Sequence, residues 1–309
     1  MNRNAPIGIF DSGVGGLTVA REVIRQLPNE RFIYFGDTAR VPYGTKSKDT
    51  IIKYTRQIIR FLESNNVKAI VVACNTASAC ALEEVGNEIK LPIIGVVKPG
   101  AAMAARATNN GKIGIIGTES TIDSGIYQQL INKYRKDSSV FLQACPLFVP
   151  LVEAGMLSDS VTEEMARRYL LQIQEKGIDT LVMGCTHYPL LRSTIRKILG
   201  ESIELINPAY ETVIELKSLL ETNDILNTSA IDNIGSIPNI NNKKSISMEL
   251  NTNNEIKQIS AKKGKTEKNL IHEEKYQFYV SDAPNKFEEF AKSISLEISK
   301  VQYVNIEEY

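Results

Sequence analysis

Short apolar runs alternate with longer segments of helical period through about the first two hundred residues of the chain. Runs of consecutive apolar residues predict buried strands at residues 7–10, 32–35 and 69–73. Residues 17–27 carry apolar side chains at helical spacing, and so do residues 51–62, where Ser47 is placed to cap the helix. Strand and helix therefore alternate from the start of the chain.

The same alternation continues further along. Additional apolar strands, each followed by a helical segment, are predicted at residues 112–116, 140–144, 180–183 and 203–206. Strands that are apolar throughout and separated by helices are typical of parallel sheets covered on both faces. The pattern predicts an α/β protein with mostly parallel, doubly wound sheets.

The two parts of this pattern resemble each other. Residues 6–12 are similar to residues 112–118, and residues 70–76 are similar to residues 181–187 at roughly the same offset. The simplest interpretation is two related α/β halves in succession, each with a cysteine just past the C-terminal end of a strand. A chance likeness between short apolar strands is the alternative.

The last part of the chain has a different composition. From about residue 227 to residue 274 it is rich in asparagine, lysine, serine and threonine, which indicates a flexible insertion rather than a packed domain. Residues 276–280 then predict a strand. Asp282-Ala283-Pro284 predicts the start of a helix that contains Phe287, Phe290 and Ala291.

Composition and charge exclude several classes of protein. The chain has 309 residues, 43% of them hydrophobic, and a formal net charge of zero, so nothing draws it to nucleic acid or to an anionic membrane. No apolar run is long enough to span a bilayer, and the N-terminus has no secretory signal, which predicts a cytoplasmic protein. Four cysteines without Cys-x-x-Cys spacing and only two histidines favour free thiols over disulfides or a metal site.

Cys74 and Cys185 are the two cysteines that follow strands in the two similar halves. Ligands of open α/β sheets bind at that end of the strands. A thiolate is a competent base and a thiol a competent acid, so two opposed cysteines suit the inversion of a carbon centre, in which a proton leaves one face and another arrives at the opposite face. Cys80 and Cys145 are interpreted as small buried residues of the core.

Polar neighbours could assist the two cysteines. Asp11 is placed to act on the Cys74 side and His187 on the Cys185 side, although a turn or N-cap carboxylate and a satisfied loop histidine are equally acceptable interpretations. An amino-acid ligand would also suit Ser12, Asn75, Thr76, Thr186 and the loop of Tyr43 and Gly44, for which capping and turn formation are the alternatives. The glycine run at residues 13–16 does not match a dinucleotide-binding motif, since Thr18 takes its last position.

Five segments together closely resemble bacterial glutamate racemases. They are Gly8-Ile9-Phe10-Asp11-Ser12-Gly13-Val14-Gly15-Gly16-Leu17, Tyr34-Phe35-Gly36-Asp37-Thr38, Val41-Pro42-Tyr43-Gly44, Ala73-Cys74-Asn75-Thr76-Ala77-Ser78 and Gly184-Cys185-Thr186-His187-Tyr188-Pro189-Leu190-Leu191. The resemblance runs through most of residues 5–222 and resumes at residues 276–294. It implies two α/β domains, residues 1–98 with 208–309 and residues 99–207, with the active site in the cleft between them.

The resemblance also implies a reaction. Glutamate would be racemised without a cofactor, with Cys74 handling the proton on the D-glutamate side, Cys185 the proton on the L-glutamate side, and Asp11 and His187 assisting. Substrate would be held by Asp11, His187, Ser12, Tyr43, Gly44, Asn75, Thr76 and Thr186; Thr118 and Glu153 match further positions with less defined roles. The product, D-glutamate, would supply peptidoglycan synthesis, and a homodimer is expected.

Two other functions fit the same residues. An aspartate racemase would use the same pair of cysteines, and a catalytically silent binding protein could use the same scaffold. Both cysteines argue against the silent protein, which needs neither. The polar insertion at about residues 227–274 departs from the family pattern and leaves oligomerisation and regulation undecided.

Overall fold

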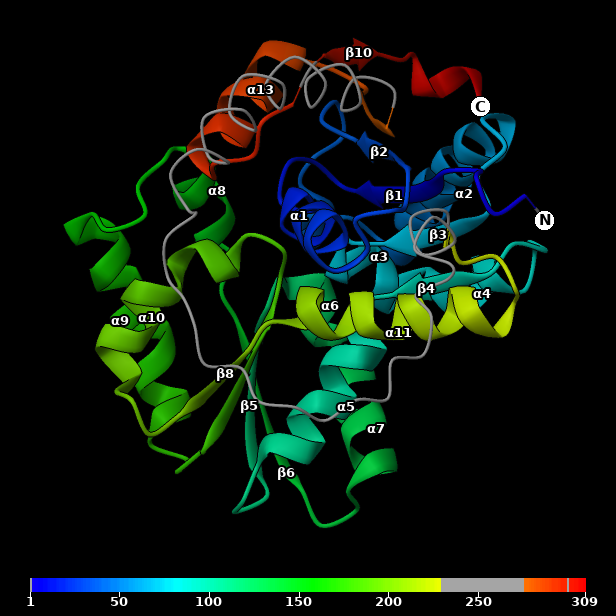
Figure 1. Cartoon of the computed structure of the whole chain (residues 1–309). Coiled ribbons are helices and arrows are strands. Elements are labelled where there is room, and N and C mark those ends of the chain that lie inside the picture. Colours follow the sequence, from blue (N-terminus) through cyan, green and yellow to red (C-terminus); the bar gives the residue numbers. More distant parts are fainter. Residues whose placement is uncertain (1, 229–274, 299) are drawn as a thin grey trace, which may run out of the picture.

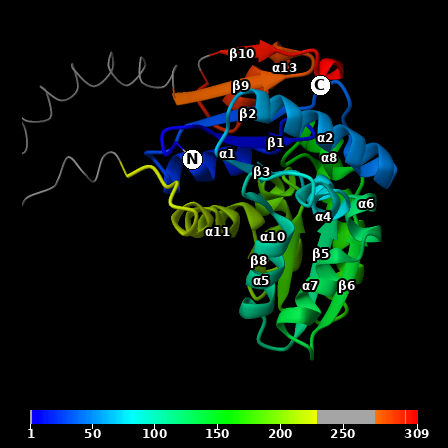
Figure 2. The ribbon, with the colours of Figure 1, turned by 90° about the vertical axis from the view of Figure 1, so that its right-hand side faces the viewer.

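Two parallel sheets organise the chain in the computed structural model, which describes residues 2–228, 275–298 and 300–309 (Figure 1). The six-stranded sheet contains β1 (Ile7–Asp11), β2 (Phe32–Gly36), β3 (Ala69–Val72), β4 (Ile93–Gly95), β9 (Tyr276–Val280) and β10 (Val301–Tyr303). The four-stranded sheet contains β5 (Lys112–Gly117), β6 (Ser139–Ala144), β7 (Thr180–Gly184) and β8 (Glu204–Ile206). Figure 2 shows one sheet above the other in side view.

The two sheets have the same strand order. The six-stranded sheet runs β10-β9-β2-β1-β3-β4 and the four-stranded sheet β6-β5-β7-β8, so the first four strands of each are arranged 2-1-3-4. Every ladder among the described strands is parallel. The order reverses between β1 and β3 in one sheet and between β5 and β7 in the other, and such switch points are where open α/β sheets bind ligands.

Helices cover both faces of each sheet. Two buried apolar clusters enclose the six-stranded sheet, and two others enclose the four-stranded sheet. The helices are α1 (Leu17–Gln26), α2 (Lys48–Ser64), α3 (Asn75–Cys80), α4 (Leu82–Gly86), α5 (Val97–Ala107), α6 (Glu119–Asp123), α7 (Ile126–Tyr134), α8 (Phe148–Glu153), α9 (Ser160–Gln174), α10 (Arg192–Leu199), α11 (Pro208–Thr222) and α13 (Pro284–Ser293). Short 3₁₀ helices are η1 (Tyr43–Thr45), η2 (Tyr188–Leu191) and η4 (Ile306–Glu308).

The α/β class predicted from the sequence is confirmed, and all predicted strands are present. Ser47 caps α2 as predicted, because its side chain accepts a hydrogen bond from the backbone N–H of Thr50. The sequence did not reveal β4 and β10, the two three-residue strands at the edges of the six-stranded sheet. The domain boundaries stay a prediction.

The predicted flexible insertion falls almost entirely outside the described residues. The residues on either side of it meet the same loop: the backbone N–H of Asn227 donates to Glu30 at 2.8 Å, and the Lys275 ammonium donates to the carbonyl of Pro28. That loop precedes β2 (Phe32–Gly36), so it lies at the amino-terminal edge of the sheet. The insertion is therefore joined to the fold at the edge opposite the strand ends that carry Cys74.

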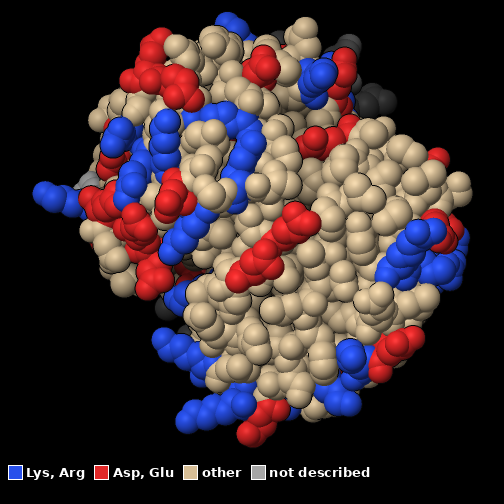
Figure 3. Space-filling view, turned by 180° about the vertical axis from the view of Figure 1, so that it is seen from behind, with Lys and Arg blue, Asp and Glu red and all other residues tan. Residues whose placement is uncertain are grey.

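The surface carries mixed charge. Figure 3 shows acidic and basic side chains crowded together on part of the viewed face, with large uncharged areas elsewhere. For example, Arg56 of α2 pairs with Glu84 of α4 and with Glu88, which follows α4. Among the described residues, none of the helices has the length and apolar character that a bilayer crossing requires.

Candidate active site

The strand registers bring the predicted residues to the switch point of each sheet. Phe10 pairs with Val72 across β1 and β3, which sets Ser12 level with Cys74 just beyond the strands. Gly117 pairs with Gly184 across β5 and β7, which sets Thr118 level with Cys185 in the same way. The two cysteines therefore occupy equivalent places in two sheets of equal strand order.

Cys74 is the N-cap residue of α3. Its Sγ accepts a hydrogen bond from the backbone N–H of Ala77 at 3.4 Å, and its thiol lies 3.6 Å from the Ser12 hydroxyl. Burial, reinforced by the negative charge of Asp11, raises the pKa of Cys74 to about 12. The thiol is therefore protonated at neutral pH.

Cys185 belongs to a chain of three side chains. Its Sγ lies 3.7 Å from Nδ1 of His187, and Nε2 of the same imidazole lies 3.0 Å from Oε1 of Glu153. Burial alone lowers the pKa of His187, but hydrogen bonds to Cys185 and Glu153 and the charges of Cys185 and Asp11 outweigh it and raise that pKa to about 10. His187 is therefore an imidazolium at neutral pH, with both N–H groups engaged.

Asp11 is a turn carboxylate, one of the two interpretations that the sequence left open, and its assisting role stays a prediction. The backbone N–H of Gly13 donates to its carboxylate at 3.1 Å, so it is a turn carboxylate. The Thr186 hydroxyl also donates to it, at 3.4 Å, and its charge acts on both Cys74 and His187. Burial raises the pKa of Asp11, against the lowering effect of His187. A buried carboxylate with a raised pKa is a better proton acceptor than an exposed one.

Polar side chains that follow strands of the two sheets form hydrogen bonds with one another. Thr76 shares hydrogen bonds with Thr118 at 2.9 Å and with Thr121 at 3.2 Å, and Thr118 and Thr121 are 3.0 Å apart. The Tyr127 hydroxyl donates to Oδ1 of Asn75 at 2.7 Å. The contacts of Thr76 and of Asn75 join residues after β3 to residues that follow β5.

The backbone approaches this site closely at two glycines. A Cβ at Gly15 would come within 2.3 Å of the Thr186 hydroxyl and 2.6 Å of Nδ1 of His187, and one at Gly44 would come within 2.5 Å of Cβ of Thr118. Neither space accommodates a methyl group. The glycines are thus required because the two halves press against each other here.

Tyr43 differs from the expected picture. Its hydroxyl donates to the buried carboxylate of Asp37, which also accepts a hydrogen bond from Ser281 at 2.8 Å and pairs with Arg40 at 2.7 Å. The side chain is 1% exposed. Tyr43 therefore anchors its loop, and it presents the backbone of Gly44, rather than its own hydroxyl, to the Thr118 side of the cleft.

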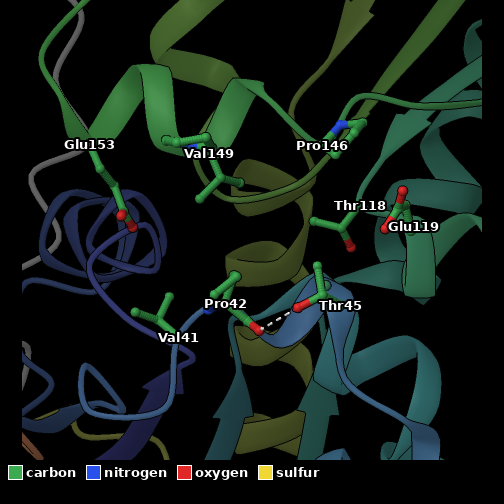
Figure 4. Close-up of a pocket in the computed structure, with 10 residues that line it drawn as sticks. Val41, Pro42, Thr45, Thr118, Glu119, Pro146, Val149 and Glu153 are labelled. Atoms are coloured by element: carbon green, nitrogen blue, oxygen red, sulfur yellow. Dashed lines mark hydrogen bonds between the residues drawn. The ribbon is translucent and has the colours of Figure 1, made fainter.

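A cavity of about 210 Å³ opens beside these residues. Figure 4 shows Glu153 at one side and Thr118 with Glu119 at the other, with Val149 and Pro146 on one wall and Val41 and Pro42 on the facing one. Its lining is mostly apolar near Val149 and polar near Thr118. This volume suits a small molecule rather than a polymer or a dinucleotide.

The arrangement is suited to proton transfer at a small polar ligand. Two thiols approach from different sheets, one held by a hydroxyl and a backbone N–H, the other by an imidazolium. No group of three or more His, Cys, Asp or Glu side chains that could hold a metal ion occurs within residues 2–228, 275–298 and 300–309. Hydroxyl, amide and backbone N–H groups around the cleft can hold carboxylates.

Replacement of Glu153 by glutamine is expected to lower the pKa of His187 by about one unit, because it removes the negative partner of Nε2. Histidine NMR titration measures this change in pKa.

The raised pKa of His187 also affects the stability of the fold. Since that pKa of about 10 lies above the ordinary value of 6.5, protonated His187 stabilises the fold below pH 6.5, and the contribution disappears as the pH rises through 10.

Assignment of that titration is simple, because His272 is the only other histidine and His272→Asn removes its signal. Glu119→Gln is the matched control, since this carboxylate lines the same cavity without contacting His187. An unchanged His187 titration in Glu153→Gln would show that the 3.0 Å contact does not control the charge of the imidazole.

Two residues at the site were not identified from the sequence. Thr121 lies one helical turn after Thr118, the N-cap residue of α6. Because residues three positions apart in a helix share a face, the sequence could have placed Thr121 beside Thr118. Tyr127 gave no signal, because its partner Asn75 is 52 positions away and only the packing of the two halves joins them. Cys145 is buried and Cys80 partly buried, as core residues should be.

Comparisons with known proteins agree with this geometry. The Asp/Glu/hydantoin racemase family model matches residues 7–215. A glutamate racemase of Geobacter metallireducens is 53% identical over 206 residues, which are 67% of this chain and 76% of that protein. A glutamate racemase of Francisella tularensis, solved in complex with D-glutamate, is 36% identical with a TM-score of 0.80 and covers 99% of this chain and 100% of its own. A Bacillus anthracis glutamate racemase has a TM-score of 0.80 at 35% identity and covers 98% of both chains.

Proposed function

We propose that this chain, which belongs to the Asp/Glu/hydantoin racemase family, interconverts L-glutamate and D-glutamate. The observation that carries the proposal is the equivalent placement of Cys74 and Cys185 beyond β3 and β7, in two sheets of the same strand order. Relatives that are about half identical to the chain are glutamate racemases, and a solved relative binds D-glutamate.

Proton transfer uses one thiol on each face of the α-carbon. In the L-to-D direction Cys185, as a thiolate paired with the His187 imidazolium, removes the α-proton. The electron pair of the broken C–H bond remains on the α-carbon and spreads into the carboxylate. The Cys74 thiol, which is protonated at neutral pH, then delivers its proton to the opposite face. The protonated Cys74 thiol thus suits this direction.

The reverse direction needs the other protonation state. Cys74 must then lose its proton before it can act as a base, and Asp11 is the buried carboxylate with a raised pKa that lies nearby. His187 returns a proton to Cys185, with Glu153 holding the imidazole in place. Asp11 and His187 are therefore assigned to assist Cys74 and Cys185 respectively, and no cofactor is assigned to any step.

Substrate is held by uncharged donors. We assign the carboxylates of glutamate to Ser12, Asn75, Thr76 and Thr186 and to the backbone around Gly44, with Thr118 at the edge of the cavity. Homodimer formation, a cytoplasmic location and the supply of D-glutamate to peptidoglycan synthesis stay predictions from the family resemblance. Placing the site in a cleft between residues 1–98 with 208–309 and residues 99–207 is part of the same proposal.

Circular dichroism of purified protein tests the substrate. Incubation with L-glutamate and, separately, with D-glutamate is expected to bring both solutions to zero optical activity, while aspartate at the same concentration stays optically active. Faster turnover of aspartate would establish an aspartate racemase instead. Binding of glutamate with unchanged optical activity would establish a binding protein on the same scaffold.

Racemisation in deuterium oxide is expected to place deuterium at the α-carbon of the product enantiomer, because the thiol proton of the delivering cysteine exchanges with solvent. Mass spectrometry or proton NMR of the separated enantiomers measures it. Complete retention of the original hydrogen in the product would exclude a mechanism with two separate thiols. Glutamate incubated without protein is the control.

A further inference from the structure

Tyr127 makes a contact that proton transfer does not require. It lies on α7, in the part of the chain that builds the four-stranded sheet, and its hydroxyl donates to Oδ1 of Asn75 at 2.7 Å. Asn75 begins α3, directly after Cys74. Both side chains are buried, with exposures of 1% for Tyr127 and 4% for Asn75. The hydrogen bond therefore fixes a site residue of one half from the other half.

The direction of this hydrogen bond is determined by burial. Burial, together with the charge of Cys185, raises the pKa of Tyr127, so the phenol keeps its proton over the working range of pH. A buried O–H group must find an acceptor, and Oδ1 of Asn75 is that acceptor within the described part of the chain. An amide oxygen that faces Tyr127 leaves the amide nitrogen on the opposite side.

Asn75 lies beside residues of the candidate site. Asn75 borders a small void together with Cys185 and Thr186. None of the described residues accepts a hydrogen bond from its Nδ2, and this nitrogen is not among the enclosed atoms without a partner. Tyr127 therefore occupies the oxygen of the Asn75 amide, while its two N–H donors have no acceptor among the described residues. Such a pair attracts a carboxylate and gives nothing to an ammonium group.

We propose that Tyr127 is a positioning residue which holds the Asn75 amide with both N–H groups toward a substrate carboxylate. The proposal rests on the proposed glutamate racemisation and adds a residue that acts on binding through Asn75. Without the Tyr127 hydroxyl, the amide can rotate and present its oxygen, which repels the carboxylate. Tyr127 thus determines the polarity that Asn75 offers to the ligand.

Kinetics of Tyr127→Phe test this role, because phenylalanine keeps the ring and removes only the hydroxyl. KM for glutamate is expected to rise about tenfold, with kcat within about twofold of wild type. A tenfold rise is the effect of losing one hydrogen bond from the Asn75 amide to the charged substrate carboxylate. Tyr134→Phe, an exposed tyrosine of the same helix, is the matched control and is expected to leave both constants unchanged. An unchanged KM in a folded Tyr127→Phe would overturn the proposal.

A double-mutant cycle separates positioning from general packing. Asn75→Ala is expected to raise KM more than Tyr127→Phe does, and adding Tyr127→Phe to it should cause no further rise. Additive effects would mean that Tyr127 acts independently of Asn75, and the proposal would fail. A wild-type protein inactive on glutamate would instead refute the proposed function, so the two failures are distinguishable.

Asn75→Asp gives a second test that does not depend on the stability of Tyr127→Phe. The aspartate keeps an acceptor for the Tyr127 hydroxyl but replaces the two N–H donors with an oxygen. KM is expected to rise above that of Asn75→Ala, because a carboxylate now faces the substrate carboxylate. A KM equal to that of wild type would contradict the donor role of Asn75, and with it the positioning role of Tyr127.

Discussion

Replacement of either Cys74 or Cys185 by serine is expected to lower kcat for glutamate racemisation at least 100-fold. In the proposed mechanism each thiol acts as the base in one direction and the acid in the other, and a positioned acid or base contributes typically 10²–10⁴-fold. A serine hydroxyl is a much weaker acid than a thiol, so it serves neither role. Circular dichroism in both directions measures the loss, and each variant should be impaired in both, because every turnover of the proposed mechanism uses both residues.

The matched control is Cys80→Ser. Cys80 lies on the helix that follows Cys74, and its sulfur contacts the carbonyl of Ser120 at 3.5 Å. A serine hydroxyl can make the same contact. The activity of Cys80→Ser should stay near that of wild type. Near-normal racemisation by Cys74→Ser or Cys185→Ser would rule out the two-thiol mechanism. One variant that still exchanges the α-proton of a single enantiomer with deuterium would identify the face served by the remaining cysteine.

Replacement of Gly15 by alanine is expected to lower kcat/KM about 100-fold while the protein stays folded. The added Cβ would lie 2.3 Å from the Thr186 hydroxyl and 2.6 Å from Nδ1 of His187, so both side chains must move. A displacement of about 1 Å at a catalytic group can cost about 10²-fold in rate. Kinetics together with thermal unfolding measure the effect on each property.

Gly13→Ala is the control for this prediction. A Cβ at Gly13 would meet Val41 at 3.5 Å, which is an ordinary contact, and the backbone N–H that donates to Asp11 is kept. Activity is therefore expected within about threefold of wild type, a small part of the loss at Gly15. Equal activity of Gly15→Ala and wild type would mean that the imidazole of His187 has more freedom than its contacts indicate.

The fold could be predicted largely from local sequence. Buried parallel strands are apolar along their whole length, so the segments that became β1, β2, β3, β5 and β7 are visible without knowledge of their neighbours. Short strands are different. Glu204–Ile206 was predicted, but Ile93–Gly95, which has the same length and pairs only at the edge of its sheet, was not. The parallel pairing of β9 with β2 depends on contacts between residues far apart in the chain.

The site was predictable where its residues stand next to strand ends. Cys74 and Cys185 were found because the two halves resemble each other, and the registers place them equivalently. The partners of Tyr43 were not foreseen, because Asp37 and Ser281 come together only after β9 has joined β2. Tyr127 was missed for the same reason, since its role depends on how one half lies against the other.

The unequal surroundings of the two sulfurs have a kinetic consequence. Cys74 has a hydroxyl and a backbone N–H beside it, whereas Cys185 has an imidazolium. The enantiomers of glutamate have identical free energies in water, so their equilibrium constant is one. The Haldane relation then requires equal kcat/KM in the two directions, however different the thiols are. The direction with the faster kcat must therefore have the higher KM. The asymmetry of the site can change kcat and KM separately for L-glutamate and D-glutamate, but it leaves kcat/KM the same for both.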